Sequence, residues 1–297
     1  MKNYANCPIC FTSSFSPFLS CKDHTVSLKE FNIVRCDECG FAFTNPIPIE
    51  TEIGDYYESS DYISHSNTNK GIVNKLYQLI RNYTIQKKIK LLVSLSKERK
   101  LLDIGSGTGE FLSECRSHGF DIQGIEPSTN GRNAAKTNHN IESHPESKLH
   151  TYSDGEFDFI TMWHVLEHVY HLNDRIEEIY RLLSEEGHLI IAVPNLKSYD
   201  AKKYGKYWAA YDVPRHLYHF SQQDIERLFG RHNFELIKVL PMKFDAYYVS
   251  MLSERYKNGG AGLVKGFING LASNLKANLG GCSSQIYLLK KNKQHSL

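Results

Sequence analysis

The chain has 297 residues, 35 of them basic and 33 acidic, so its formal net charge is only +2. This near balance argues against a protein built mainly to bind nucleic-acid backbones, which needs a strongly basic surface. No apolar run approaches the roughly 20 residues of a membrane span, and the N-terminus lacks the apolar core of a signal peptide. We therefore expect a globular, cytoplasmic protein that has neither nucleic acid nor a membrane among its partners.

Four of the seven cysteines form two CxxC pairs, Cys7 with Cys10 and Cys36 with Cys39. Disulfides are rare in the reducing cytoplasm, whereas two such pairs can hold one zinc ion with each sulfur about 2.3 Å from it. The residues between the pairs can form a hairpin. Because four thiolates leave no open coordination position, we predict a structural zinc ion in a zinc-ribbon-like module over residues 1–50; the alternative is four buried free thiols.

The middle of the chain changes pattern twice. Residues 51–98 become helical from about Ile72 to Leu95, and we expect them to form a helical linker or lid. The apolar residues that recur there at helical spacing are Val73, Leu76, Leu79 and Ile80. From residue 100 onward, strand-like runs alternate with helical ones, which predicts a parallel α/β sheet with right-handed crossovers. We expect strands at 101–104, 121–125, near 141, at 157–162, 188–193, 234–240 and 285–290, with helices at 110–118, 129–138, 174–183, 222–231, 244–257 and 263–276.

A glycine-rich turn joins the first of these strands to its helix. Gly105 and Gly107 allow a ligand to approach the backbone, and the helix N-terminus offers amide donors. Glu126 ends the next strand, where an acid can accept both hydroxyls of a ribose. The pattern thus predicts a nucleotide cofactor, although its spacing alone does not say which one.

The string LLDIGSGTG, residues 101–109, resembles the first motif of class I S-adenosylmethionine-dependent methyltransferases. GIEPS and FDFI resemble further elements of that family, and the resemblance covers about residues 100–240. It implies a Rossmann-like, mainly parallel sheet of seven strands with helices on both faces, over residues 99–297, and S-adenosylmethionine as cofactor. Asp103 and the glycine turn would hold the methionine end, and Glu126 would hold the ribose. The cofactor-binding residues it predicts are Asp103, Gly105, Ser106, Gly107, Glu126, Pro127 and Trp163.

A polar cluster follows the fourth strand of this pattern. His164, Glu167 and His168 have the spacing i, i+3, i+4, which would place them on one face of a helix. In one interpretation His164 is a general base near the transferred methyl group. In a second the three residues bind a metal, since HxxEH resembles the ExxEH ligand string of ubiquinone O-methyltransferases and of a plant small-RNA 2′-O-methyltransferase. In a third they pack a loop.

A second cluster lies in an insertion around residues 195–220, where the fold usually contacts its substrate. We expect Tyr211, Arg215 and His219 to bind substrate, and His216 to act in catalysis together with His164. An arginine can bind a phosphate or carboxylate through two hydrogen bonds. The string PRHLYHF also resembles one found in bacterial methyltransferases. The alternative is that this segment only leads into a helix capped by Ser221.

These observations together predict a methyltransferase whose substrate is a small molecule or a glycan precursor. A nucleotide sugar is the first choice, because zinc knuckles before such a domain resemble the nucleotide-sugar C-methyltransferases. One alternative is an RNA methyltransferase that uses the zinc module to grip RNA. Another, of a different class, is a non-catalytic scaffold that retains the cofactor pocket.

Overall fold

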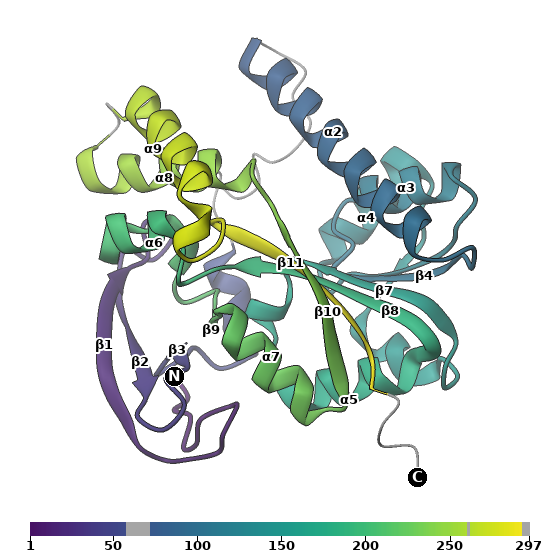
Figure 1. Ribbon diagram of the computed structural model, residues 1–297, viewed down its shortest axis with the longest axis horizontal. Helices are drawn as coiled ribbons and strands as arrows, with labels where there is room; N and C mark the ends of the chain where they lie inside the picture. The colour runs from purple at the N-terminus through teal and green to yellow at the C-terminus, as the bar shows by residue number, and fades with distance from the viewer. Residues whose placement is uncertain (58–71, 260–261, 293–297) are drawn as a thin grey trace.

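The predicted sheet is present, with seven strands in the order β10-β11-β8-β7-β4-β5-β6 (Figure 1). The computed structural model describes residues 1–57, 72–259 and 262–292. Strands β4 to β8 are parallel, and β11 runs antiparallel to both of its neighbours. The strands are β4 (Lys100–Ile104), β5 (Asp121–Ile125), β6 (Ser143–His144), β7 (Phe157–Trp163), β8 (Leu183–Pro194), β10 (Phe234–Pro241) and β11 (Ser284–Lys291). The prediction of a Rossmann-like, mainly parallel α/β sheet is confirmed.

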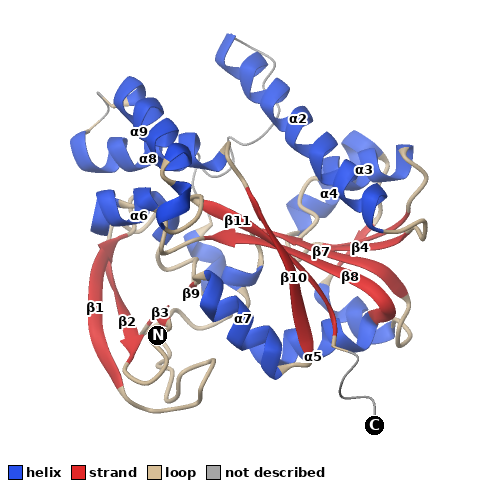
Figure 2. Cartoon of the chain, viewed as in Figure 1, coloured by secondary structure: helices blue, strands red, loops and turns tan. Residues whose placement is uncertain are grey.

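Helices cover both faces of this sheet (Figure 2). Successive residues of a strand point to opposite faces, so Leu102 packs into the core under α5 and α7, whereas Leu101 packs into the core under α2, α3 and α4. The α-helices are α2 (Ile72–Leu95), α3 (Glu110–Ser117), α4 (Thr129–His139), α5 (Leu172–Leu182), α6 (Tyr199–Tyr204), α7 (Gln222–Arg231), α8 (Asp245–Asn258) and α9 (Leu263–Leu275). Among the described residues, no helix is long and apolar enough to cross a membrane.

The expected helix from Ile72 to Leu95 has those same bounds in the structure. Among its described side chains, Ile85, Ile89 and Leu92 are buried, whereas Leu79 is exposed. The predicted helix is thus confirmed, and its C-terminal half packs on the domain. Residues 58–71 of the expected linker lie outside the described residues.

The N-terminal residues form a second, antiparallel sheet in the order β1-β2-β3-β9. Its strands are β1 (Phe15–Lys22), β2 (Glu30–Cys36), β3 (Ala42–Thr44) and β9 (Tyr218–His219). The β1–β2 hairpin lies between the two CxxC pairs, as the sequence allowed. Strand β9 comes from the insertion after β8, and Phe43 pairs with Tyr218 and shares one hydrophobic core with it. The N-terminal module is therefore joined to the main domain by a shared sheet and a shared core.

Short 3-10 turns complete the insertion and the other connections. They span Ile53–Tyr56, Glu146–Thr151, Leu166–His168, Gly205–Tyr207, Ala209–Tyr211 and Ala277–Leu279. Two of them lie between α6 and β9, so the expected loop at 195–220 is a folded segment that packs between the N-terminal sheet and α8.

Candidate functional site

The glycine turn after β4 has the open geometry that the sequence predicts. Gly105 and Gly107 both have positive φ, 77° and 55°, a conformation that glycine adopts without strain. A Cβ at Gly105 would collide with Val165, so the turn is held close to the segment after β7. A Cβ at Gly107 would meet nothing within 4 Å. The backbone of Gly107 therefore faces open space that a ligand can enter.

Glu126 lies beside this turn with its carboxylate fixed by two backbone amides. The Gly107 amide donates to Oε2 and the Ser128 amide to Oε1, each at 2.8 Å. Burial raises the pKa of Glu126, against the lowering effect of these hydrogen bonds. Ser128 caps α4 through its hydroxyl, and the neighbouring Pro127 is exposed. The predicted acid thus stands at the turn, as expected for a residue that can bind hydroxyl groups.

Asp103 is buried at the end of β4 and accepts a 2.6 Å hydrogen bond from the Thr161 hydroxyl. Burial raises its pKa to about 7. The ammonium group of Lys88, on α2, lies 3.9 Å from the centre of the Trp163 ring, and burial lowers the pKa of Lys88 to about 8. The sequence analysis missed Lys88, because nothing in the sequence separates it from the neighbouring lysines of α2.

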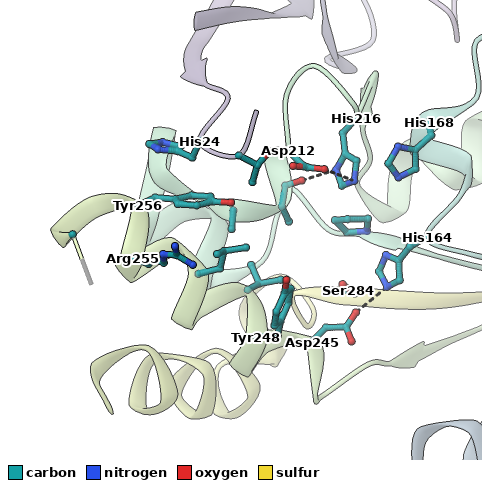
Figure 3. Close-up of a pocket in the computed structure, with 17 residues that line it drawn as sticks. His24, His164, His168, Asp212, His216, Asp245, Tyr248, Arg255, Tyr256 and Ser284 are labelled. Carbon is teal, nitrogen blue, oxygen red and sulfur yellow. Dashed lines mark hydrogen bonds and ion pairs between the residues drawn. The ribbon is translucent and has the colours of Figure 1, made fainter. Parts of the chain in front are cut away.

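A cavity of about 1030 Å³ opens at the carboxyl edge of the sheet (Figure 3). The ends of β7 and β8 and the start of β11 form its floor, through His164, Pro194 and Ser284. Its other walls come from α8, from the insertion at 209–216 and from the N-terminal module. Side chains that line it include Tyr248 and Tyr256 of α8, His216, and His24, whose ring stacks on Tyr256 at 4.2 Å.

His164 is on the floor of the cavity, held between two carboxylates. Its Nε2 lies 2.9 Å from Asp245 Oδ2 and its Nδ1 lies 3.3 Å from Glu167 Oε1. Burial disfavours the charged ring, but the hydrogen bonds and charges of Asp245 and Glu167 outweigh it and raise the pKa of His164 to about 10. An imidazolium has no lone pair with which to take up a proton. This arrangement therefore disfavours His164 as a general base at neutral pH.

The prediction that His164, Glu167 and His168 share a helix face is wrong. His164 has a φ of 57° and precedes a 3-10 turn that contains only Glu167 and His168 of the three. The turn instead brings Glu167 and His168 toward His216, and ligand atoms of these three residues all lie within 4.8 Å of one another. The metal interpretation of His164, Glu167 and His168 stays a prediction, and the converging group in the structure is a different one.

Glu167 is the buried centre of this group, with no exposed surface. Its Oε2 has no hydrogen-bond partner among the residues that the structure describes. His216 Nε2 lies 4.0 Å from Glu167 Oε1, while His216 Nδ1 lies 2.8 Å from the Ala210 carbonyl oxygen. His168 Nδ1 lies 3.0 Å from the Arg215 carbonyl oxygen. With Nδ1 donating to the Ala210 carbonyl, an uncharged His216 ring has an Nε2 lone pair available, whereas His168 Nδ1 also lies 2.9 Å from the Tyr57 hydroxyl.

Arg215, Tyr211 and His219, which we expected to bind substrate, lie behind the cavity wall rather than on it. Arg215 is 1% exposed and forms ion pairs with Asp212 at 2.6 Å and Asp23 at 3.1 Å. His219 Nε2 lies 3.1 Å from the Thr44 hydroxyl, and Tyr211 is buried against Trp208. The structure brings His164 and His216 together at the cavity, and it places these three residues where they support the insertion.

The four cysteines of the CxxC pairs converge. Cys7 and Cys39 have their Sγ atoms 3.6 Å apart, those of Cys10 and Cys36 are 3.4 Å apart, and all four lie within 4.8 Å of one another. A tetrahedral ion with sulfur ligands at about 2.3 Å needs sulfur separations of about 3.8 Å. The donor set and its spacing therefore fit a tetrahedral metal ion.

The ion pair of His164 leads to a prediction about its titration. Because its folded pKa is raised above the ordinary value near 6.5, the pair stabilises the fold fully below that pH. This contribution is lost as the pH rises toward about 10. In ¹⁵N-resolved spectra we expect the His164 ring to remain an imidazolium at pH 8 and to deprotonate at lower pH in Asp245→Asn. A wild-type midpoint near the ordinary histidine value of about 6.5 would contradict this.

Comparison with known proteins adds to this geometry. A family model described as a methyltransferase domain matches residues 77–239, more than half of the chain. No curated protein matches the chain in sequence. A magnesium protoporphyrin IX methyltransferase from Synechocystis PCC 6803, solved with bound SAH, is 15% identical with a TM-score of 0.54, over 82% of this chain and 100% of that one. A SAM-dependent methyltransferase from Archaeoglobus fulgidus is 19% identical with a TM-score of 0.51, over 71% and 94%.

Identities this low show the fold alone, whereas the family match covers the glycine turn, Glu126 and the histidine cluster. The chain therefore belongs to the methyltransferase domain family, and it is a methyltransferase with the fold of the S-adenosylmethionine-dependent enzymes.

Proposed function

We propose that the protein transfers a methyl group from S-adenosylmethionine to a small acceptor bound in the cavity. The observation that carries this proposal is the close approach of the glycine turn to the segment after β7. Val165 packs against Gly105, and the adjacent His164 lines the cavity. A cofactor on the turn and an acceptor in the cavity would then meet at one edge of the sheet, beyond the carboxyl ends of its parallel strands.

Six groups of this chain are suited to hold the cofactor. The turn from Gly105 to Gly107, open at Gly107, would accommodate its methionine end, and Asp103 with the Lys88 ammonium would pair with the charged groups there. Glu126, already fixed beside the turn, would accept the ribose hydroxyls. Pro127 and Trp163 would flank the bound molecule. When bound, the cofactor supplies an electrophilic methyl group to the acceptor.

His216 is the better placed of the two histidines to act as base. Its Nδ1 donates to the Ala210 carbonyl oxygen, so Nε2 can accept the proton that an acceptor hydroxyl or amine loses as its bond to the methyl carbon forms. Glu167 and Asp212, at 4.0 and 3.9 Å from Nε2, would stabilise the resulting imidazolium. His164 would remain charged and orient Glu167.

The acceptor class that we propose is a small molecule or glycan precursor, with a nucleotide sugar first. The cavity volume of about 1030 Å³ suits a ligand of that size, and its wall offers tyrosine and histidine side chains for polar contacts. Transfer to RNA and a non-catalytic scaffold remain the alternatives. Balanced overall charge counts against RNA, and the open glycine turn with its fixed Glu126 counts against a scaffold.

We also propose that the four cysteines bind one structural zinc ion. Their convergence supports it, and four thiolates are a donor set that zinc prefers. The ion would tie the loop before β1 to the end of β2. It would thereby stabilise the sheet that carries His24 to the cavity.

The cofactor proposal predicts tight binding of S-adenosylhomocysteine at the glycine turn. In calorimetry the wild type should bind it, and Gly107→Arg should lose binding because the new side chain fills the open space and strains a positive φ. Gly230→Arg is the matched control, since Gly230 on α7 also has nothing within 4 Å. Equal affinity in wild type and Gly107→Arg would overturn the assignment.

The reaction is tested with methyl-labelled cofactor and a panel of nucleotide sugars and their parent sugars. We expect label in at least one of them and a loss of turnover of about 100-fold or more in His216→Gln, with unchanged affinity for S-adenosylhomocysteine. His171→Gln, far more exposed, is the control. Label in RNA instead would favour the RNA alternative, and binding without any transfer would favour the scaffold.

The zinc proposal predicts one zinc ion per chain in protein purified without chelators. Elemental analysis should find it in the wild type and in Cys282→Ser, whose cysteine lies outside the cluster, but not in Cys10→Ser. Chelation should also lower the thermal stability of the wild type, since binding and folding of such a module are coupled. Zinc-free wild-type protein of unchanged stability would contradict the proposal.

A further inference from the structure

Helix α9 packs on the domain through its small and polar side. A Cβ at Gly266 would lie 2.5 Å from Met251 Cα, and one at Gly270 would lie 2.6 Å from Tyr247 Cα, so α9 contacts the backbone of α8. Between them, the buried Asn269 donates hydrogen bonds to the Tyr204 hydroxyl at 2.7 Å and to Glu254 Oε1 at 2.9 Å. This tight packing fixes the rotation of α9 about its axis.

The rest of the α9 surface is apolar and exposed, although the Phe267 ring also stacks on Tyr247 of α8 at 4.8 Å. Its large side chains are between 43% and 76% exposed and recur at three- and four-residue spacing along one face. They are Val264, Phe267, Ile268, Leu271 and Leu275. In Figure 1 this helix lies against α8, and its C-terminal end leads to β11 of the large sheet. A continuous apolar stripe of this kind marks an interaction site.

The exposed charged residues around the stripe are almost all basic. Those on or beside α9 are exposed lysines: Lys265 and Lys276 on and just after the helix, Lys243, whose carbonyl accepts from Asn274, and Lys257 at the end of α8. Lys265 forms an ion pair with Glu254 at 3.6 Å, whereas no ion pair of Lys243, Lys257 or Lys276 is present among the described residues. Asp200 and Glu254 are buried, and Asp245 faces the cavity with His164.

We propose that the α9 face, defined by the apolar stripe and these lysines, docks on an anionic lipid membrane. An interfacial helix inserts apolar side chains at the level of the headgroups, while flanking lysines meet lipid phosphates. Both features are present here, and a membrane-spanning helix is not needed. A nucleic acid would match the lysines but would leave five large apolar side chains in water.

The same docking would bring the cavity close to the lipid. Helix α8 lies under α9 and lines the cavity with Tyr248, Val249 and Leu252 on its other side. An acceptor carried in the membrane could then reach the cavity without leaving the surface. This consequence rests on the proposed function, whereas the docking itself does not.

Co-sedimentation with lipid vesicles tests the proposal. We expect the full chain to bind vesicles of phosphatidylcholine mixed with phosphatidylglycerol, to bind phosphatidylcholine alone weakly, and to lose binding as salt is raised. The double variant Phe267→Ser and Ile268→Ser, and separately Lys243→Glu with Lys276→Glu, should each lower the partition coefficient about tenfold or more. Ile237→Ser, an exposed apolar residue on β10, is the matched control.

Calorimetry with S-adenosylhomocysteine on the same variants separates this proposal from the proposed function. Retained cofactor binding with lost vesicle binding supports membrane docking. Wild-type protein that does not bind anionic vesicles overturns it. So does self-association that the Phe267→Ser and Ile268→Ser variant abolishes, or binding to RNA in place of vesicles.

Discussion

The close contact between Gly105 and Val165 is the constraint on which the site depends. Because a side chain at Gly105 would collide with Val165, the turn after β4 can lie directly against the segment after β7. That contact brings the open backbone at Gly107 and the carboxylate of Glu126 to the same edge of the sheet as His164. Parallel strands alone would align the strand ends, but only a glycine allows the two turns to touch.

A buried ion-pair network holds together the segments that form the cavity walls beside this edge of the sheet. Arg215 links Asp212 of its own segment to Asp23 after β1 and to the Tyr56 carbonyl oxygen, so three distant parts of the chain meet at one guanidinium. Burying such charges costs desolvation energy, and removing one partner would leave the others uncompensated. The role of this network is therefore structural rather than ligand binding. It keeps the N-terminal module and the insertion in the positions where His24 and His216 face the cavity.

Local patterns in the sequence predicted the parts of this structure that local geometry determines. The glycine turn, the acid at Glu126 and the two CxxC pairs each depend on residues close in sequence, and the strand and helix periodicity located most elements within a few residues. Asp245 could not be predicted as the partner of His164, because 81 residues separate them and only the return of the chain through β10 brings them together. Arg215 has the sequence signature of a ligand clamp, but its carboxylate partners come from the fold.

Helix α9 shows most clearly why periodicity is not enough. Its apolar spacing is that of an ordinary core-facing helix, and the sequence gives no sign that this face points to water. The reason lies in buried acids on other elements. Asp200 accepts hydrogen bonds from Ser273 of α9, from Trp208 and from Ser283, while Glu254 accepts one from Asn269. Rotating α9 to bury its apolar stripe would remove the Ser273 donor from Asp200 and the Asn269 donor from Glu254, and these losses oppose the rotation. The buried hydrogen bonds between α9 and its neighbours thus keep the apolar face of α9 exposed.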